Sequence, residues 1–334
     1  MEATMKTYQK QKDAIITLGI HRSGTSMTSS LVQRWAQYSG AACKDKIIDP
    51  LNPKGYFEST EVQSTLIDAA SYLIQSKNIS GWSHSFNQHL NSLIVKNTRF
   101  ANALEHQFKK LRDVGVPWCS KSPMFCITVP LWEHFVEDPV LIITVRNPYD
   151  TARSLLNLKG KKQTQGGIVS NLLIWQHYLA KALQDTSKSK RRFFVSYEKI
   201  IEDPELQITK LSDFLKQEFP NISNQEGALK EMLEIVEPRL HRNVSKTNFD
   251  ECSEATETQK ELYALLQKIA NDQTIPTDID YDRYQLTEQE IRVLEKNKLH
   301  IIPNIRKRTL KHYWSICEYL ISQLNIKRYY AKKS

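Results

Sequence analysis

The sequence lacks the features that mark disulfide-rich, zinc-binding and membrane-spanning proteins. Its 334 residues include five scattered cysteines, with no Cys-x-x-Cys pair and no Cys and His at zinc-ligand spacing. No apolar run approaches the roughly 18 residues that a membrane-spanning helix needs. The first thirteen residues are polar and contain no apolar core of a signal peptide. We therefore expect a cytoplasmic protein without a disulfide framework and without a metal site.

The composition is that of a globular protein, with 40% hydrophobic and 25% charged residues. The formal net charge of +9 favours an anionic partner, such as a phosphorylated ligand, an anionic membrane or a nucleic acid. The stretch 306–334 holds eight basic residues and one acidic residue, so most of the positive surplus lies there.

Short apolar runs alternate with helical patterns, which predicts an α/β fold with a P-loop-like central parallel sheet flanked by helices. In such sheets, ligands bind at the carboxyl ends of the strands. We expect one domain over 14–250 and a basic helical C-terminal extension over 253–334, with a loop or linker at 271–282. The expected strands are 14–20, 118–120, 141–145 and 193–197, and the expected helices are 25–38, 148–158, 168–184 and 206–215.

The first strand runs into a glycine-rich turn, Gly-Ile-His-Arg-Ser-Gly-Thr-Ser, over 19–26. Backbone N–H groups in such a turn, together with the dipole of the following helix, make an anion site. Thr25 stands where an ATP-binding loop carries its lysine, and Arg22 instead supplies a cation inside the loop. The pattern therefore predicts an anion site of another kind, surrounded by the hydroxyls of Ser23, Thr25 and Ser26.

This loop resembles the first motif of the sulfotransferases that use 3′-phosphoadenosine 5′-phosphosulfate (PAPS), especially their bacterial and carbohydrate-type members. Their motif Pro-(Arg/Lys)-Ser-Gly-Thr-(Ser/Thr) stands here with only the proline replaced, by His21. The resemblance implies that PAPS is the donor substrate. It also implies that the loop holds the 5′-phosphosulfate through Arg22, Ser23, Gly24, Thr25 and Ser26.

A second motif follows the strand at 141–145. Arg146, Asn147 and Pro148, with Ser154 eight residues after Arg146, resemble the 3′-phosphate motif of the same family. A helix rises about 1.5 Å per residue, so Ser154 can lie near the arginine at the strand end and converge with it on one phosphate.

Further segments, up to residue 243, also resemble segments of this family. Tyr197 and Glu198, followed by Asp203-Pro204, resemble the Tyr-Glu-Asp-Leu…Asp-Pro segment, which implies that Tyr197 lies beside the nucleotide. A strand end and a helix start explain Glu198 and Asp203 equally well. Arg239 and Arg242 resemble a basic loop that closes over the 3′-phosphate, with a solvated charge cluster as the alternative.

Sulfuryl transfer needs cations on the bridging oxygen of the leaving phosphate, and Arg22 and Lys121 are the candidates. Lys121 resembles a donor-contacting lysine of the family, although Pro123 stands where some members carry a catalytic histidine. Glu58, which ends the stretch Asn-Pro-Lys-Gly-Tyr-Phe-Glu, resembles the acceptor base of related enzymes. A helix cap is the alternative for Glu58, and His21 and His84 are lesser candidates for the base.

The last segment predicts an amphipathic helix with basic flanks. We expect its apolar stripe to dock on the catalytic domain, with peripheral contact to a membrane surface as the alternative. The stripe consists of Leu310, Tyr313, Trp314, Cys317, Ile321 and Leu324.

The sequence thus favours a PAPS-dependent sulfotransferase acting on a hydroxyl or amine of a carbohydrate, glycolipid or small alcohol, with no nucleic-acid partner. One alternative is a P-loop kinase, which would need an acidic metal ligand where the second strand ends in Arg146. Another is a nucleotide- or membrane-binding module without catalysis.

Overall fold

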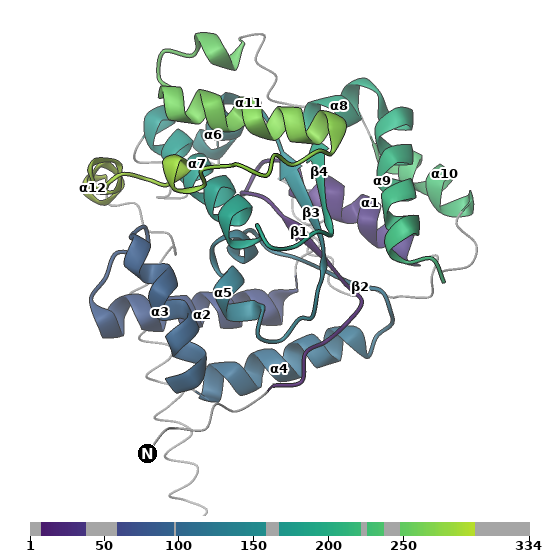
Figure 1. Ribbon diagram of the computed structural model, residues 1–334, viewed down its shortest axis with the longest axis horizontal. Coiled ribbons are helices and arrows are strands. Elements are labelled where there is room, and N and C mark those ends of the chain that lie inside the picture. The colour runs from purple at the N-terminus through teal and green to yellow at the C-terminus, as the bar shows by residue number, and fades with distance from the viewer. Residues whose placement is uncertain are drawn as a thin grey trace, which may run out of the picture.

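Four parallel strands form the centre of the computed structural model, which describes residues 8–37, 59–96, 98–157, 167–221, 226–236 and 248–297 (Figure 1). Their order in the sheet is β2-β1-β3-β4, and every residue of the four strands is buried. A parallel sheet covered on both faces explains why β1 and β3 are nearly continuous apolar runs rather than alternating ones. The strands are β1 (Ala14–Leu18), β2 (Trp118–Lys121), β3 (Val140–Val145) and β4 (Arg192–Ser196).

Helices cover the two faces of this sheet, so the predicted α/β fold is confirmed. The helices are α1 (Thr25–Gln37), α2 (Thr60–Lys77), α3 (His84–Lys96), α4 (Thr98–Arg112), α5 (Val129–Trp132), α6 (Pro148–Leu156), α7 (Gly167–Asp185), α8 (Tyr197–Glu202), α9 (Pro204–Glu218), α10 (Glu226–Ile235), α11 (Glu257–Asp272) and α12 (Glu288–Lys296). Short 3-10 helices are η1 (Pro123–Ile127), η4 (Phe249–Glu251) and η5 (Asp282–Tyr284).

Alternate strand residues enter two hydrophobic clusters on opposite faces of the sheet. Ile16 and its neighbours on one face pack against α2, α3, α4, α7 and α11. Ile15 and its neighbours on the other face pack against α1, α9 and α10, which lie together in Figure 1. This alternation, in which successive side chains point to opposite faces, fixes which side of the sheet each strand-end residue takes.

The outer edge of β4 is closed by the side chain of one residue rather than by a fifth strand. Gln273, which ends α11 in a left-handed conformation, accepts the N–H of Phe194 at 2.9 Å and donates to the Phe194 carbonyl at 2.8 Å. Its amide group thus takes the place of a neighbouring peptide unit. An edge satisfied in this way cannot pair with another chain at that point.

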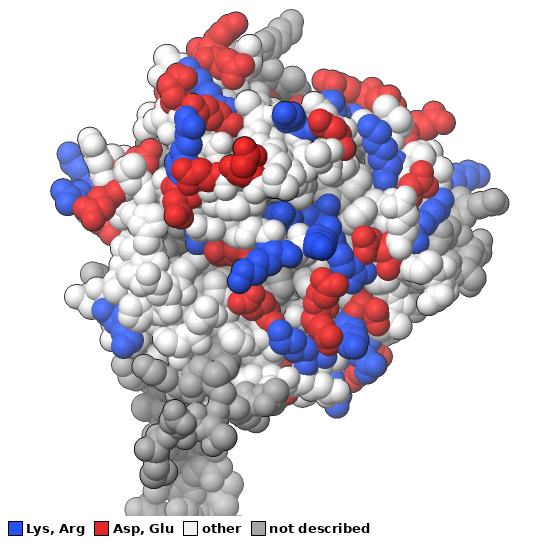
Figure 2. Space-filling model, viewed as in Figure 1, with Lys and Arg blue, Asp and Glu red and all other residues white. Residues whose placement is uncertain are grey.

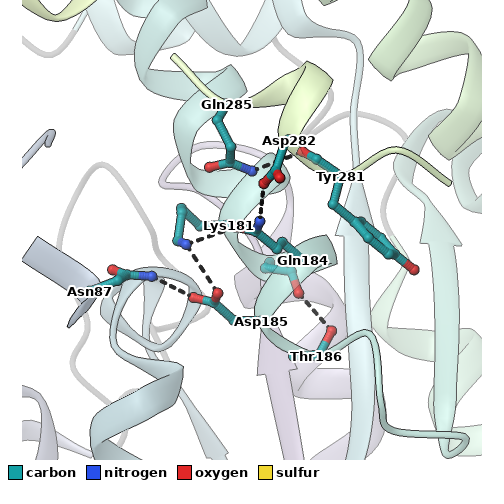
Figure 3. Close-up of polar contacts among 9 residues, drawn as sticks. Asn87, Lys181, Gln184, Asp185, Thr186, Tyr281, Asp282 and Gln285 are labelled. Carbon is teal, nitrogen blue, oxygen red and sulfur yellow. Dashed lines mark hydrogen bonds and ion pairs between the residues drawn. The ribbon is translucent and has the colours of Figure 1, made fainter. Parts of the chain in front are cut away.

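The described part of the predicted extension packs on the same core as the strands. Leu262, Leu266 and Ile269 of α11 belong to the cluster that contains Ile16. Figure 3 shows how η5 is tied to α7: Gln184 donates to Asp282 at 2.8 Å, while Lys181 binds the neighbouring Asp185. The division of the chain into 14–250 and 253–334 remains a prediction. None of the described helices is long and apolar enough to cross a membrane.

Candidate active site

The turn between β1 and α1 takes a backbone path that glycine permits. Gly19 has φ +148° and Gly24 has φ +93°, both in the region that L side chains rarely adopt. A Cβ on Gly24 would lie 2.2 Å from Cδ2 of Tyr197, and a Cβ on Gly19 would lie 2.5 Å from Cγ2 of Thr25. Arg22 adopts φ +69° without being glycine. The turn is therefore held in a tight conformation by its neighbours.

Internal bonds hold the turn and leave its inner amides available. Ser23 is fully buried, and its Oγ donates to the Ile20 carbonyl at 2.7 Å. The Gly19 N–H donates to Sγ of Cys126 at 3.1 Å, and burial raises the pKa of that thiol to about 12, so it is a neutral acceptor. The N–H groups of residues 24–26 donate to no other residue that the structure describes. These N–H groups lie at the start of α1, and the N-terminus of a helix favours an anion.

The first and second motifs are bonded directly to one another. Nε of Arg22 donates to Oγ of Ser154 at 3.0 Å, across 132 positions of sequence. Nη1 of Arg146 donates to the Arg22 carbonyl at 2.9 Å. Arg146 and Ser154 are almost fully buried, at 6% and 2% exposed. The neighbouring ends of β1 and β3 thus bring two guanidinium groups and one hydroxyl together.

The start of α6 is satisfied by its own cap. Oδ1 of Asn147 accepts the N–H groups of Tyr149 and Asp150, and the Asn147 carbonyl accepts that of Thr151. The second motif therefore offers an anion its side chains, whereas the first loop offers backbone amides.

Tyr197 packs between the two motifs. Its ring touches the Cα side of Gly24, and the guanidinium carbon of Arg146 lies 4.5 Å from the ring centroid. Burial raises the pKa of Tyr197, so the phenol stays neutral around pH 7. Tyr197 begins α8 rather than ending β4, which turns its ring toward the loop.

The two acidic residues of the third segment make structural bonds. Asp203 caps α9 by accepting the Leu206 N–H at 3.1 Å. Oε1 of Glu198 accepts the Asn147 N–H at 2.8 Å and so fixes the start of the second motif. The helix start that the sequence offered as the alternative for Asp203 is thus confirmed, whereas the bond between Glu198 and Asn147 was not predicted.

Lys121 ends β2 and lies beside β1, in register with Thr17. Parallel strands end at a common edge, so Lys121 shares that edge with the loop at 19–24. Lys121 is only 2% exposed, and by register it takes the same side of the sheet as Thr144, whose buried hydroxyl has no hydrogen-bond partner within the described residues. The buried Ser120 hydroxyl, which also has no such partner, takes the opposite side.

Three predicted site residues, Glu58, Arg239 and Arg242, lie outside the described residues, as does the amphipathic segment after residue 297. His21 is exposed on the loop, and Nε2 of His84 lies 3.1 Å from the Leu286 carbonyl. Among the described residues, no group of three or more His, Cys, Asp or Glu side chains is placed to hold a metal ion.

Sequence reasoning missed the contacts that position these motifs. The Cys126 thiol is 107 residues from the glycine that it contacts, and no local pattern marks it. The polar Asn147 before Pro148 does carry a signal, because Asn followed by Pro at the first helical position is typical of a helix cap.

The chain is similar to several known sulfotransferases. Among solved structures, the chain resembles the sulfotransferase domain from the curacin biosynthetic pathway, at 14% identity and a TM-score of 0.42 over 88% of this chain and 100% of that one. It also resembles the sulfotransferase domain of the Synechococcus PCC 7002 olefin synthase, at 19% identity and a TM-score of 0.40 over 86% and 96%. Sulfotransferase STF9 from Mycobacterium avium follows at 15% identity and a TM-score of 0.38 over 85% and 76%.

No curated protein sequence matches the chain. The sequence model of the sulfotransferase family matches residues 14–221, which span β1 through α9 and include the loop at 19–26 and the segment at 146–154. Because this match covers more than half of the 334 residues, the chain belongs to the sulfotransferase family.

Proposed function

We propose that the protein transfers a sulfuryl group from PAPS to a hydroxyl or amine of an acceptor. The observation that carries this proposal is the bond between Arg22 and Ser154. It joins a loop with available amides to a buried arginine–serine pair, which supports a proposal of two neighbouring anion subsites. A donor with anionic groups at both the 3′ and the 5′ position of its ribose fits that arrangement, and PAPS has this chemistry.

The side chains and amides at this site suit the two anionic groups of such a donor. The amides of residues 24–26 and the Arg22 guanidinium suit the 5′-phosphosulfate. Arg146 and the Ser154 hydroxyl suit the 3′-phosphate, because charge-assisted bonds from a buried arginine are strong. Arg239 and Arg242 complete the proposed donor site from outside the described residues.

In the proposed reaction, the acceptor oxygen or nitrogen forms a bond to sulfur while the bond from sulfur to the phosphate oxygen breaks. Arg22 and Lys121 stabilise the negative charge that develops on the leaving phosphate. Glu58 takes the proton of the acceptor. We expect a carbohydrate, glycolipid or small alcohol as acceptor, in agreement with the resemblance to carbohydrate-type members.

Calorimetric titration tests the donor site directly. Adenosine 3′,5′-bisphosphate, titrated in EDTA, should bind the full-length protein without metal. Arg146→Ala should weaken this binding about 10- to 100-fold, the effect of losing a charged hydrogen bond. Arg153→Ala is the matched control, because this arginine lies exposed on α6; its affinity should stay within about twofold of the wild type.

A parallel titration with ATP and magnesium separates the alternatives. Preference for magnesium-ATP over the bisphosphate would favour the P-loop kinase and contradict the sulfotransferase proposal. If the bisphosphate binds but Glu58→Gln and Lys121→Ala leave transfer from PAPS unchanged, those two residues have no role in the reaction. Binding of the bisphosphate without turnover on any acceptor would favour the non-catalytic module.

A further inference from the structure

Glu198 reaches from the first turn of α8 to the start of the second motif. Its Oε1 accepts the Asn147 N–H at 2.8 Å, so the residue after Arg146 is held from the neighbouring strand end. The other carboxyl oxygen, Oε2, is buried and has no hydrogen-bond partner within the described part of the chain. An unsatisfied buried carboxyl oxygen is costly, so it calls for an explanation at this place.

Charged and titratable groups face Glu198 from each element packed around it. They are Arg146 at the end of β3, Asp150 on α6, Tyr197 on α8 and Tyr263 on α11. Burial raises the pKa of Glu198. The N–H groups of Asn147 and of Glu198 itself lower it, as does the Arg146 guanidinium, and Asp150 raises it. The 2%-exposed Asp150 therefore places a second carboxyl group near Glu198.

We propose that Glu198 is a positioning residue that holds the Asn147 main chain and takes up a proton when a phosphate binds beside Arg146. The inference rests on the proposed function, in which Arg146 and Ser154 hold the 3′-phosphate of the nucleotide. Glu198 does not touch the reacting atoms; it acts through the backbone that carries Arg146.

Proton uptake follows from the charges. A phosphate monoester carries close to two negative charges at neutral pH. Bound to Arg146, it offsets the positive charge that stabilises the ionised carboxylate of Glu198, and it adds a like charge nearby. Both effects favour the protonated carboxyl. The proton goes to Oε2, which has no hydrogen-bond partner among the described residues, and Oε1 keeps its bond from Asn147.

The test is calorimetric titration of the full-length protein with adenosine 3′,5′-bisphosphate at pH 7.5, in two buffers with different ionisation enthalpies. The difference in heat gives the number of protons taken up. At this pH the phosphates of the nucleotide contribute little, because their second pKa is about 6. The wild type should take up a measurable fraction of one proton. Its affinity should fall as pH rises from 7 to 9, by at most about tenfold per pH unit for one linked proton.

Three variants separate positioning from proton uptake. Glu198→Gln keeps an oxygen that accepts from Asn147, so it should bind the bisphosphate but take up fewer protons, and its affinity should vary less with pH. Glu198→Ala also loses the acceptor, and its affinity should be lower than that of Glu198→Gln throughout. Glu202→Gln, which changes an exposed carboxylate on the same helix, should behave like the wild type.

The outcomes distinguish this inference from the proposed function. Equal proton uptake by the wild type and Glu198→Gln overturns the inference and leaves the donor site intact. Absence of uptake in the wild type overturns it whether or not the variants fold. Failure of the bisphosphate to bind the wild type overturns the proposed function, and this inference with it.

Discussion

At the scale of single residues, Gly24 shows how packing and backbone conformation act together. It combines φ +93° with a Tyr197 ring that a Cβ would meet at 2.2 Å. We predict that Gly24→Ala displaces the ring or the loop, at a cost of about 1–3 kcal/mol in the free energy of unfolding. Affinity for adenosine 3′,5′-bisphosphate should fall at least about tenfold. Denaturant unfolding and calorimetric titration measure the two effects.

Gly167 supplies the matched control for that variant. It also has a positive φ, +71°, but a Cβ there would meet nothing within 4 Å. Gly167→Ala should therefore show only the backbone cost of about 1–2 kcal/mol and an unchanged affinity. Wild-type affinity in Gly24→Ala would mean that the contact between Gly24 and Tyr197 does not shape the anion site.

Ser154 gives a second prediction at this scale. Ser154→Ala removes the acceptor of the Arg22 Nε and one donor for the proposed 3′-phosphate. We expect about tenfold or greater loss of bisphosphate affinity, since bonds to charged groups contribute about 1.5–3 kcal/mol. Ser212→Ala also deletes a buried hydroxyl, one on α9 with no partner among the described residues, and should bind normally. Equal affinities for the two variants would contradict the role of Ser154.

Sequence reasoning located the residues of this site better than the contacts between them. Arg22, Arg146 and Ser154 could be named because each lies in a short motif next to a strand end. The bond from Asn147 to Glu198 spans 51 positions, and nothing local marks it. Such contacts depend on which strands become neighbours, and the strand order β2-β1-β3-β4 cannot be deduced from any short segment of the sequence.

At the scale of elements, the pairing of Gln273 with Phe194 shows how an edge strand is closed. Phe194 is 1% exposed, so both of its backbone groups would be left unsatisfied without the Gln273 amide. We predict that Gln273→Ala lowers the free energy of unfolding by about 1–3 kcal/mol for each group that loses its partner. Denaturant unfolding measures the loss.

Gln273→Gly distinguishes the contribution of the side-chain amide bonds to stability from that of backbone strain. Gln273 has φ +57°, so glycine relieves about 1 kcal/mol of strain while it still removes the side-chain bonds. This variant should be more stable than Gln273→Ala and less stable than the wild type. A Gln273→Gly protein as stable as the wild type would show that the two bonds contribute nothing net.

The predicted strands and helices agree with the structure where apolar runs or capping residues are strong. β3 follows the run Leu-Ile-Ile-Thr-Val, and α6 begins at the predicted Pro148. α2, α3 and α4, which lie within 60–112, were not predicted, apart from the helix start that the alternative role of Glu58 implied. In the structure, Ser59 is the N-cap of α2 and makes no side-chain cap bond. Their place on the sheet follows from packing of Leu66, Phe86 and Leu104 in the shared core.

At the scale of the whole molecule, charge is unevenly spread along the chain. Residues 306–334 carry a positive surplus of seven out of the formal net charge of +9, and they lie outside the described residues. Figure 2 shows Lys and Arg side chains near the centre of one face, with Asp and Glu side chains around them. Ion pairs among the described residues include those of Arg191 with Glu218 and Asp138. Contact of the basic segment with a membrane surface remains a proposal.

The stability of the whole fold should depend on pH through His177. This side chain is 5% exposed beside the Trp82 ring, and burial, with Lys181 and His84 nearby, lowers its pKa to about 3. The unfolded chain binds a proton at an ordinary histidine pKa near 6.5, whereas the folded chain does not. Between these two values, stability therefore falls as pH falls, by up to about 1.4 kcal/mol per pH unit from this group.

Buried carboxyl groups act in the opposite direction. Burial raises the pKa of Glu198 and Asp185, so the folded protein holds their protons above the pH at which the unfolded chain releases them. Their contribution to stability is present at low pH and is lost as pH rises through the folded-state values. The change in the wild type's free energy of unfolding with pH is therefore the sum of opposing contributions from the histidine and the carboxyl groups. A variant that lacks His177 is needed to isolate the contribution of the histidine.

His177→Phe keeps a ring against Trp82 and removes the titrating group. We predict that its advantage in stability over the wild type grows as pH falls from 6.5 toward 4, at up to about 1.4 kcal/mol per pH unit. Urea unfolding at several pH values measures the two curves. His89→Phe, which changes a half-buried histidine on α3, is the matched control and should leave the slope unchanged. Parallel curves for His177→Phe and the wild type would mean that His177 gains a proton without unfolding, because buried groups around it adjust to the charge.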